Sequence, residues 1–244
     1  MKRILLLTAM ITTMAIHVQA QLGIGVELGF NASDYNIETN NKQKQTDMKF
    51  GGRLGGFVDY AFANHFYFQP GIYHVTNGYK SNLANGYEQY TISTVEIPLN
   101  IVYKTGFFEN STFFVGVGPF LGYNRDGEYY IQSGSIISKK DLDFGKWPID
   151  DIRKLDLGGG ANIGYQNETG FFLRARAQMG LLNLVPGKNR TSSMESVGYC
   201  LSVGYIFYTK NKMGKTKMRK GYKPIIKVKD RIKVEDDRPE NRVQ

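Results

Sequence analysis

Seven charged residues in the body of the chain have the types and the spacing to form one network of ion pairs. Each lies on the polar side of a short segment in which apolar residues alternate with polar residues or glycine. Enclosed charges are tolerated when they pair and hydrogen-bond, and Glu27 and Arg53 lie on neighbouring segments and could pair. The alternative is a gated pore or a polar ligand pocket lined by Arg174 and Arg176. The seven residues are Glu27, Arg53, Asp59, Glu96, Asp156, Arg174 and Arg176.

The chain has few residues of the types that commonly act in catalysis. Of the three histidines, His17 lies in the N-terminal apolar stretch, His65 lies next to a short connection, and His74 lies on the apolar side of its segment. No serine, histidine and acid can be placed together, and the single cysteine, Cys200, has no partner for an internal disulfide. The sequence therefore predicts no enzyme, no cofactor and no metal site.

A group of acidic residues lies in the connection between residues 124 and 155. Carboxylate oxygens are ligands that Ca²⁺ prefers, so this connection is a candidate site for calcium or for cations that bridge lipopolysaccharide. The spacing is not that of an EF-hand loop, which favours a solvated acidic loop instead. The residues are Asp126, Glu128, Asp141, Asp143, Asp150 and Asp151.

Eight segments of alternating character would position the charged residues. In residues 196–208 the odd positions from Val197 to Phe207 are apolar, whereas the even positions begin with serine, glycine and cysteine. A period of two is typical of β-strands, and about ten residues cross a bilayer as a tilted strand. The segments are 22–31, 50–60, 65–77, 90–104, 112–124, 155–166, 171–181 and 196–208.

Two further features favour a membrane barrel over a soluble β-sandwich or a lipocalin-like barrel. The clearer segments carry no charged residue on their apolar side, as expected where that side meets lipid. The connections after the second, fourth and sixth segments are short, and the others are long and polar, which matches periplasmic turns and external loops. We therefore expect an all-β, eight-stranded antiparallel up-and-down transmembrane β-barrel over residues 21–208, monomeric and with its lumen filled by side chains.

The N-terminus, residues 1–20, has the organisation of a cleavable signal peptide. Lys2 and Arg3 precede an apolar stretch, and small residues stand at Val18 and Ala20, the positions that a signal peptidase reads. The stretch is too short to span a bilayer as a helix. We expect an exported protein whose mature chain begins at residue 21.

The net charge of +9 is concentrated at the end of the chain. Residues 209–244 hold 13 Lys/Arg and 5 Asp/Glu. The barrel topology places this tail in the periplasm, where nucleic acid is absent, so we expect either contact with an anionic envelope polymer, lipid phosphates or an acidic protein, or a solvated tail. Residues 224–229 could add a strand to a partner's sheet. The basic residues expected to make contacts are Lys215, Lys217, Arg219, Lys220, Lys223, Lys227 and Lys229.

Four short motifs resemble those of the PorT-like outer-membrane β-barrel family. They are GVELGFNAS at residues 25–33, GGRLGGF at 51–57, YFQPG at 67–71 and VEIPLN at 95–100. The resemblance covers the chain from residue 21 to the last segment, and it implies a barrel in the outer membrane of a Gram-negative cell envelope. One member of the family is a component of a type IX secretion system, whereas most relatives have no established activity.

Together these features predict a non-enzymatic outer-membrane barrel that serves as a structural or interaction platform, with its tail docking a periplasmic partner. A narrow, porin-like transport pore or a barrel associated with type IX secretion is the alternative, and an outer-membrane enzyme is the third candidate. A wide diffusion channel is not expected, because aqueous channels come with about 16 to 18 strands.

Overall fold

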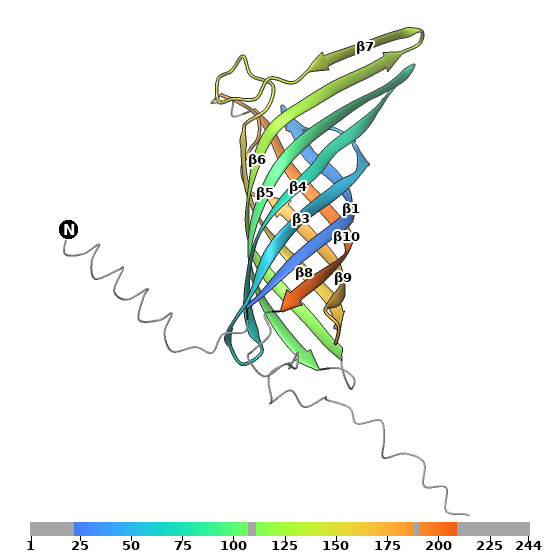
Figure 1. The fold of residues 1–244 in the computed structure, drawn as a ribbon. Helices are drawn as coiled ribbons and strands as arrows, with labels where there is room; N and C mark the ends of the chain where they lie inside the picture. The colour runs from blue at the N-terminus through green and yellow to red at the C-terminus, as the bar shows by residue number, and fades with distance from the viewer. Residues whose placement is uncertain (1–21, 107–110, 188–190, 209–244) are drawn as a thin grey trace, which may run out of the picture.

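The computed structural model describes residues 22–106, 111–187 and 191–208. Eight long strands form a ring of antiparallel neighbours, and the pairing of β10 with β1 closes it (Figure 1). The predicted all-β up-and-down barrel is therefore confirmed. Within these residues no helix is long and apolar enough to cross a membrane. The ring strands are β1 (Leu22–Thr39), β3 (Asp47–Ala63), β4 (Phe66–Leu83), β5 (Gly86–Gly106), β6 (Ser111–Ser133), β8 (Leu155–Asn167), β9 (Phe171–Gly180) and β10 (Ser192–Tyr208); two short strands, β2 (Lys42–Gln43) and β7 (Ile136–Asp141), add to them.

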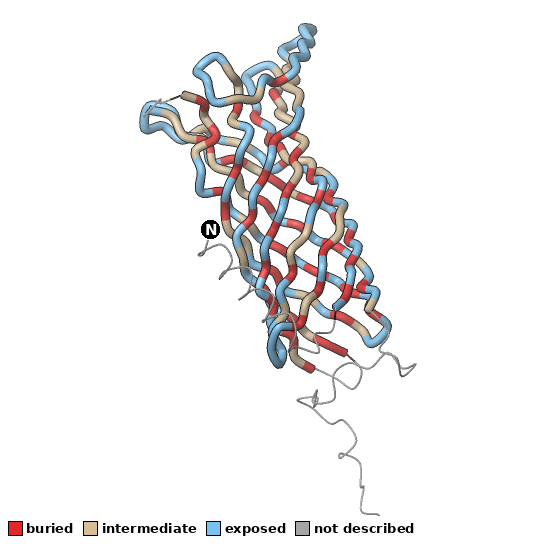
Figure 2. The backbone as a smooth tube through the Cα atoms, turned by 60° about the vertical axis from the view of Figure 1, so that its left-hand side comes forward, coloured by how far each residue is buried: buried red, intermediate tan, exposed pale blue. Residues whose placement is uncertain are grey.

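The alternating sequence gives the wall two different faces. In β1, Leu28 and Phe30 are exposed on the outside, whereas Glu27 and Asn31 are buried on the inside, and Figure 2 shows the same alternation of buried and exposed residues along the strands. Successive side chains of a strand point to opposite faces. An apolar exterior around a polar interior suits lipid, because the closed ring pairs the backbone groups of every strand.

The two ends of the barrel differ. Gly23 pairs with Tyr208, so the described chain begins and ends at one end, which also carries the short turns between β3 and β4 and between β8 and β9 (Figure 1). We call it the terminal end and the opposite end the loop end. The predicted signal peptide (1–20) and tail (209–244) lie outside the described residues.

The strands at the loop end are longer than the sequence pattern indicated. Residues 78–89, expected to form a long polar loop, continue β4 and β5 to a two-residue turn at Ala84 and Asn85, and β6 extends to Ser133 before turning into β7. The prediction of a long loop is wrong for residues 78–89, whereas the connection from β6 to β8 is long as predicted but begins later and contains β7. Both faces of these extensions carry polar and tyrosine side chains, so the apolar alternation that marks a strand in lipid is absent from them although the backbone pairing continues.

Two apolar clusters fill the inside of the molecule. One lies towards the terminal end and is made largely of aromatic and β-branched residues from the barrel wall. The other lies at the loop end and includes residues from the connections. The first contains Phe57, Tyr73, Val75, Val102, Phe114, Phe172 and Ile206, and the second contains Tyr35, Tyr79, Ile92, Leu142, Ile152, Leu184 and Met194.

Candidate functional site: the filled lumen and the loop end

Two arginine–glutamate pairs occupy the middle of the lumen. Arg174 Nη1 lies 2.7 Å from Glu27 Oε2, and Arg53 Nη1 lies 2.9 Å from Glu96 Oε1. The suggested pairing of Glu27 with Arg53 is therefore wrong. Each observed pair joins strands with one strand between them, β1 with β9 and β3 with β5. A long arginine side chain reaches across the intervening strand inside a closed barrel, and this proximity is invisible in the order of the chain.

The Glu27 carboxylate is the centre of a larger group of hydrogen bonds. The Tyr73 hydroxyl donates to Oε2 at 3.0 Å, and the Ser202 hydroxyl donates to Oε1 at 2.8 Å. Arg174 also donates through Nη2 to Gln69 Oε1 at 3.0 Å. A buried ion pair is stable only when further hydrogen bonds satisfy its remaining atoms. The Glu27 carboxylate meets that requirement with side chains from four strands, whereas Arg174 Nε is buried without a hydrogen-bond partner among the described residues.

A second group of polar side chains fills the terminal end of the lumen. Asp59 accepts hydrogen bonds from Lys104 Nζ at 2.7 Å, Gln69 Nε2 at 2.7 Å and the Tyr208 hydroxyl at 3.1 Å. Gln166 Nε2 donates to the Tyr208 oxygen at 2.8 Å. Since Tyr208 is the last residue of β10, this group closes the lumen where the described chain ends.

Aromatic rings fill the space that glycines leave inside the barrel. Three phenylalanine rings surround the Arg174 guanidinium, with ring centres 4.8 to 5.3 Å from its central carbon, a favourable cation–π geometry. Each ring lies over a glycine of the neighbouring strand, where a Cβ would overlap it. The small residues on the lumen side thus make room for rings. The pairs are Phe57 with Gly25, Phe114 with Gly164, and Phe172 with Gly204.

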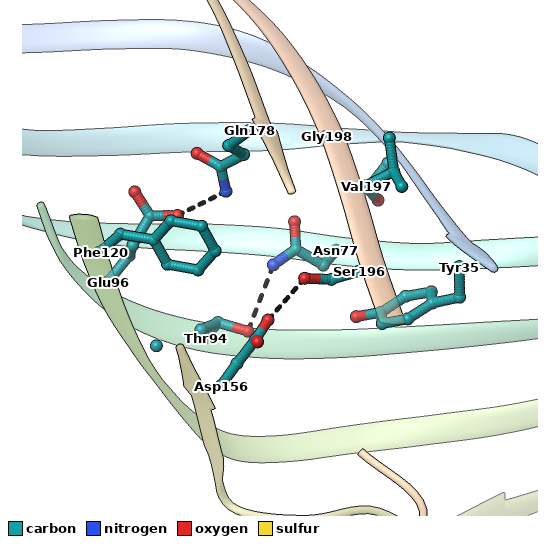
Figure 3. A pocket seen from close by; sticks show the side chains of 12 residues that line it. Tyr35, Asn77, Thr94, Glu96, Phe120, Asp156, Gln178, Ser196, Val197 and Gly198 are labelled. Atoms are coloured by element: carbon teal, nitrogen blue, oxygen red, sulfur yellow. Dashed lines mark hydrogen bonds between the residues drawn. The ribbon is translucent and has the colours of Figure 1, made fainter. Parts of the chain in front are cut away.

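Asp156 lies beside a small enclosed cavity nearer the loop end (Figure 3). Its Oδ2 accepts a hydrogen bond from the Ser196 hydroxyl at 2.6 Å. Asp156 Oδ1 and Gln178 Oε1 are buried without a partner among the described residues. The cavity has a volume of about 10 Å³, which is the size of one water.

Two members of the predicted network, Asp156 and Arg176, lack an ion pair within the described part of the chain. Arg176 lies on the lumen side of β9, two residues after Arg174. It is 6% exposed, and its Nε and Nη2 atoms are buried without a hydrogen-bond partner there. The structure therefore brings Glu27, Arg174, Arg53 and Glu96 into direct pairs, whereas Arg176 is only enclosed beside them.

The apolar cluster at the loop end covers the polar part of the lumen. Leu142 and Ile152 come from the connection between β7 and β8, and Leu184 follows β9; they pack with Tyr35 and Ile92 of the barrel wall. Backbone hydrogen bonds fix the connections, from Leu142 N–H to the Gly127 carbonyl at 2.9 Å and from Leu184 N–H to the Met194 carbonyl at 2.8 Å. Side chains thus occupy the lumen from its terminal end to its loop end.

Comparisons with known proteins identify the family of this barrel. The profile of the family described as outer membrane protein beta-barrel domain matches residues 18–185. The chain belongs to this family. Its place is therefore the cell outer membrane, and the exposed apolar wall is the surface that meets lipid. No curated protein matches the sequence significantly.

The fold of this chain is similar to the solved structures of several bacterial outer-membrane proteins. Ail of Yersinia pestis is 13% identical with a TM-score of 0.41, and the match covers 77% of this chain and 99% of that one. Neisserial surface protein A is 12% identical with a TM-score of 0.41, covering 78% and 100%. OprG of Pseudomonas aeruginosa is 12% identical with a TM-score of 0.37, covering 78% and 97%.

The acidic residues of the loop end are distributed among separate partners. Within residues 22–106, 111–187 and 191–208 no three metal-ligating side chains come together. Asp150 instead accepts a hydrogen bond from the backbone N–H of Trp147 at 2.7 Å. The ion pairs are Arg125 with Asp126, Lys139 with Glu128, and Lys140 with Asp151.

Asp151 has the clearest electrostatic role among these acids. Partial burial disfavours its charged form, but the backbone N–H of Asp143 and the ammonium of Lys140 outweigh that effect and hold its pKa below the usual range. The hydrogen bonds measure 3.0 Å from the Asp143 N–H and 2.9 Å from Lys140 Nζ. This carboxylate therefore ties β7 to the connection that follows it.

The remaining residues singled out by the sequence lie apart from the lumen network. His65 stands in the turn between β3 and β4, with φ of +66° and Nδ1 3.0 Å from the Lys104 carbonyl oxygen. His74 faces outwards on β4. Cys200 is buried on the lumen side of β10. The basic residues of the tail lie outside the described residues; they are Lys215, Lys217, Arg219, Lys220, Lys223, Lys227 and Lys229.

Two important residues of this outer-membrane barrel were missing from the predicted network. Lys104 forms the ion pair with Asp59, and Gln69 bridges the two polar groups by bonding both Asp59 and Arg174. Lys104 lies on the same polar side of its segment as Glu96, and this shared side indicated that Lys104 faces the lumen. Gln69 precedes Pro70 in the segment with the least regular alternation, so little in the sequence marked it.

Proposed function

We propose that this protein is a closed, non-enzymatic outer-membrane barrel that acts as an interaction platform, displaying its loop end outside the cell and docking an envelope component through residues 209–244. The observation that carries the proposal is the filled lumen. Ion pairs, aromatic rings and the apolar loop-end cluster follow one another along the barrel axis. The features that remain available for contact are the ends.

The filled lumen makes a transport pore the weaker alternative. An eight-stranded barrel has an interior just wide enough for side chains to fill it. Here Glu27, Arg53, Glu96 and Arg174 are each at most 1% exposed at their side chains. Ions would have to displace paired charges to pass.

Conductance measurements in planar bilayers test the closed lumen. We expect the mature wild-type chain to give no discrete current steps under conditions in which an open porin, inserted as a positive control, conducts. Steps from the wild-type chain whose ion selectivity changes in Arg176→Gln would overturn the closed barrel and favour the pore. Arg176→Gln suits this test because it removes a lumen charge without leaving a direct ion-pair partner behind.

The loop end offers an apolar tip for a partner. Ile136 and Ile137, where β6 turns into β7, are 73% and 61% exposed, on a hairpin that projects beyond the rest of the barrel (Figure 1). Exposed apolar groups on a surface in water often mark interaction sites. Short turns at the terminal end and longer connections at the loop end support an outward direction for this hairpin.

Surface labelling in intact cells tests this orientation. A cysteine introduced by Ser138→Cys on β7 should react with a membrane-impermeant maleimide, whereas one introduced by Thr216→Cys should react only after the outer membrane is permeabilised. The wild-type chain is the control, since its own Cys200 is buried. The reverse labelling pattern would overturn the orientation.

Affinity purification from crosslinked envelopes tests the platform role. We compare the full mature chain, a chain ending at Tyr208 and an Ile136→Asn/Ile137→Asn variant, after confirming that all three reach the outer membrane. A partner lost only with the tail supports periplasmic docking, and one lost only with the double variant supports an external partner. Type IX secretion proteins among the partners would support a secretion-associated barrel instead, whereas identical partner sets for all three chains would contradict the platform.

A further inference from the structure

An open hollow lies on the outside of the loop end, apart from the lumen. Its volume is about 1170 Å³, above the roughly 300 to 1,000 Å³ of typical small-molecule sites. Most of its lining is apolar. The apolar side chains come from the connection between β7 and β8, from the start of β8 and from the residues after β9; they are Phe144, Trp147, Pro148, Leu155 and Leu182.

The hollow is continuous with the wall that meets lipid. Leu155, the first residue of β8, lines it, and Leu157 continues the same outward face further along the strand; both are exposed. Leu182 lines it from the other side, one residue after Leu181, whose backbone N–H donates to the Leu157 carbonyl at 2.8 Å. The hollow thus stands where the apolar band of the wall ends.

Three cations surround this apolar surface. Lys146, Arg153 and Lys154 line the hollow. The one carboxylate in the lining, Asp150, is occupied by the backbone N–H of Trp147 at 2.7 Å. Arg153 donates through Nη2 to the Gly187 carbonyl at 2.9 Å, whereas its Nε is buried without a partner among the described residues. An anionic group in the hollow would meet an excess of positive charge.

The walls of the hollow are fixed to one another by the backbone. Gly145 N–H donates to the Ile152 carbonyl at 2.9 Å, and Gly187 N–H donates to the Lys146 carbonyl at 3.2 Å. Gly187 has φ of +80° and lies against Pro148, so a larger residue there would be strained. A site whose parts are already held in place loses less entropy when it binds a ligand.

We propose that this hollow binds a phosphorylated, acylated glycolipid of the outer leaflet, with acyl chain on Trp147 and Leu155 and phosphate beside Lys146 and Lys154. Apolar surface next to cations at the edge of the lipid-facing wall matches the two parts of such a molecule. The assignment to the outer leaflet rests on the orientation in the proposed function, whereas binding by the purified protein does not depend on it.

The sole tryptophan of the chain reports on this site. Trp147 is 63% exposed and lines the hollow. With the full mature chain folded in a neutral detergent, we expect diphosphorylated lipid A to shift the Trp147 emission to shorter wavelength and to reduce its quenching by iodide. The comparison ligands are inorganic phosphate, the same glycolipid without its phosphates, and phosphatidylglycerol.

A matched pair of double variants tests the cations. Lys146→Gln/Lys154→Gln should raise the lipid A concentration for half-maximal response roughly ten- to thirty-fold, since each basic residue near an anionic lipid surface contributes about one kcal/mol and about 1.4 kcal/mol is tenfold. The control Lys42→Gln/Lys139→Gln removes the same charge from the loop end at residues that do not line the hollow, and it should leave that concentration unchanged.

The remaining outcomes overturn the proposal. An equal response to inorganic phosphate would show an anion site without an acyl component, and an equal response to the dephosphorylated glycolipid would show apolar adsorption alone. An equal response to phosphatidylglycerol would remove the preference for a glycolipid. No response to lipid A, or the same loss in both double variants, would reject the site while leaving the conductance and labelling results of the proposed function intact.

Discussion

The lumen and the loop end of this barrel are built on opposite principles. Within the height of the membrane, the interior combines paired charges such as Arg174 with Glu27 and the buried rings packed around them, and the exterior is apolar. Beyond it, the interior of the loop end is an apolar cluster around Ile92 and Ile152, and the outside carries exposed ion pairs such as Lys140 with Asp151.

The difference follows from the solvent that each region meets. A wall in lipid gains little from burying apolar side chains, because lipid chains are as apolar as the side chains themselves. Polar groups there must find partners inside the barrel. The loop end lies in water, where burying Ile92 and its neighbours is favourable. The two regions should therefore respond to different mutations, which the following predictions test in order of decreasing effect.

Breaking a lumen ion pair should have the largest effect. Arg174→Met removes the partner of Glu27 and leaves its carboxylate buried, which typically costs about 3 to 5 kcal/mol. Arg176→Met is the matched control, because Arg176 is also buried on β9 but lacks an ion pair within the described residues. We expect its effect on the free energy of unfolding to be much smaller. Urea unfolding in detergent, followed by the far-ultraviolet circular dichroism of the strands, measures both, and equal losses would contradict the role of pairing.

Emptying the loop-end cluster should have the next largest effect, confined to that end. Ile92 is fully buried, and Ile92→Ala should destabilise its surroundings by about 2 to 4 kcal/mol through lost contacts and a cavity. Trypsin cleavage after Lys146 and Lys154 should accelerate more than tenfold, while the circular dichroism of the strands stays unchanged. Loss of the barrel signal together with the loop end would show that the two regions unfold as one unit.

Crowding an aromatic ring inside the lumen should cost less. A Cβ at Gly164 would overlap the ring of Phe114 and the backbone carbonyl oxygen of Leu173, whereas nothing lies near the position of a Cβ at Gly159 on the same strand. Gly164→Ala should therefore lower the free energy of unfolding by about 1 to 3 kcal/mol, and Gly159→Ala should change it by less than about 0.5 kcal/mol. Equal effects of the two substitutions would mean that the rings do not depend on the glycines beneath them.

The sequence predicted the structure correctly where a strict alternation of apolar and polar residues runs along the strand. In β1 and β10 the alternation assigns Glu27 to the lumen and Leu201 to the exterior, and the structure agrees. The fold and the enclosed charges follow from that pattern together with the absence of charge on the apolar side.

The pairs and the loop end could not be predicted, for two physical reasons. Partners in the lumen meet across an intervening strand, so the order of segments misassigned Arg53 to Glu27 when its partner is Glu96. At the loop end the outer face of the strands meets water and the inner face includes polar residues such as Ser81 and Glu88. Residues 78–89 therefore show no alternation of apolar and polar residues although they form strands. The hollow beside Trp147 is formed by connections whose contacts no local pattern records.

Acidification of the loop end should have the smallest effect. The pKa of Asp151 is held below its usual range by the Asp143 N–H and Lys140 against the effect of burial. Its contribution is therefore complete above the ordinary aspartate pKa of about 3.9, and it is lost as the pH falls through the lowered value. Trypsin is inactive at such low pH, so pepsin is the protease for this test. The measurement is the rate of pepsin cleavage at the loop end at pH 4.5 and at pH 2, two conditions that roughly span the titration of Asp151. Asp151→Asn should remove this dependence, and an unchanged profile in that variant would assign it to another group.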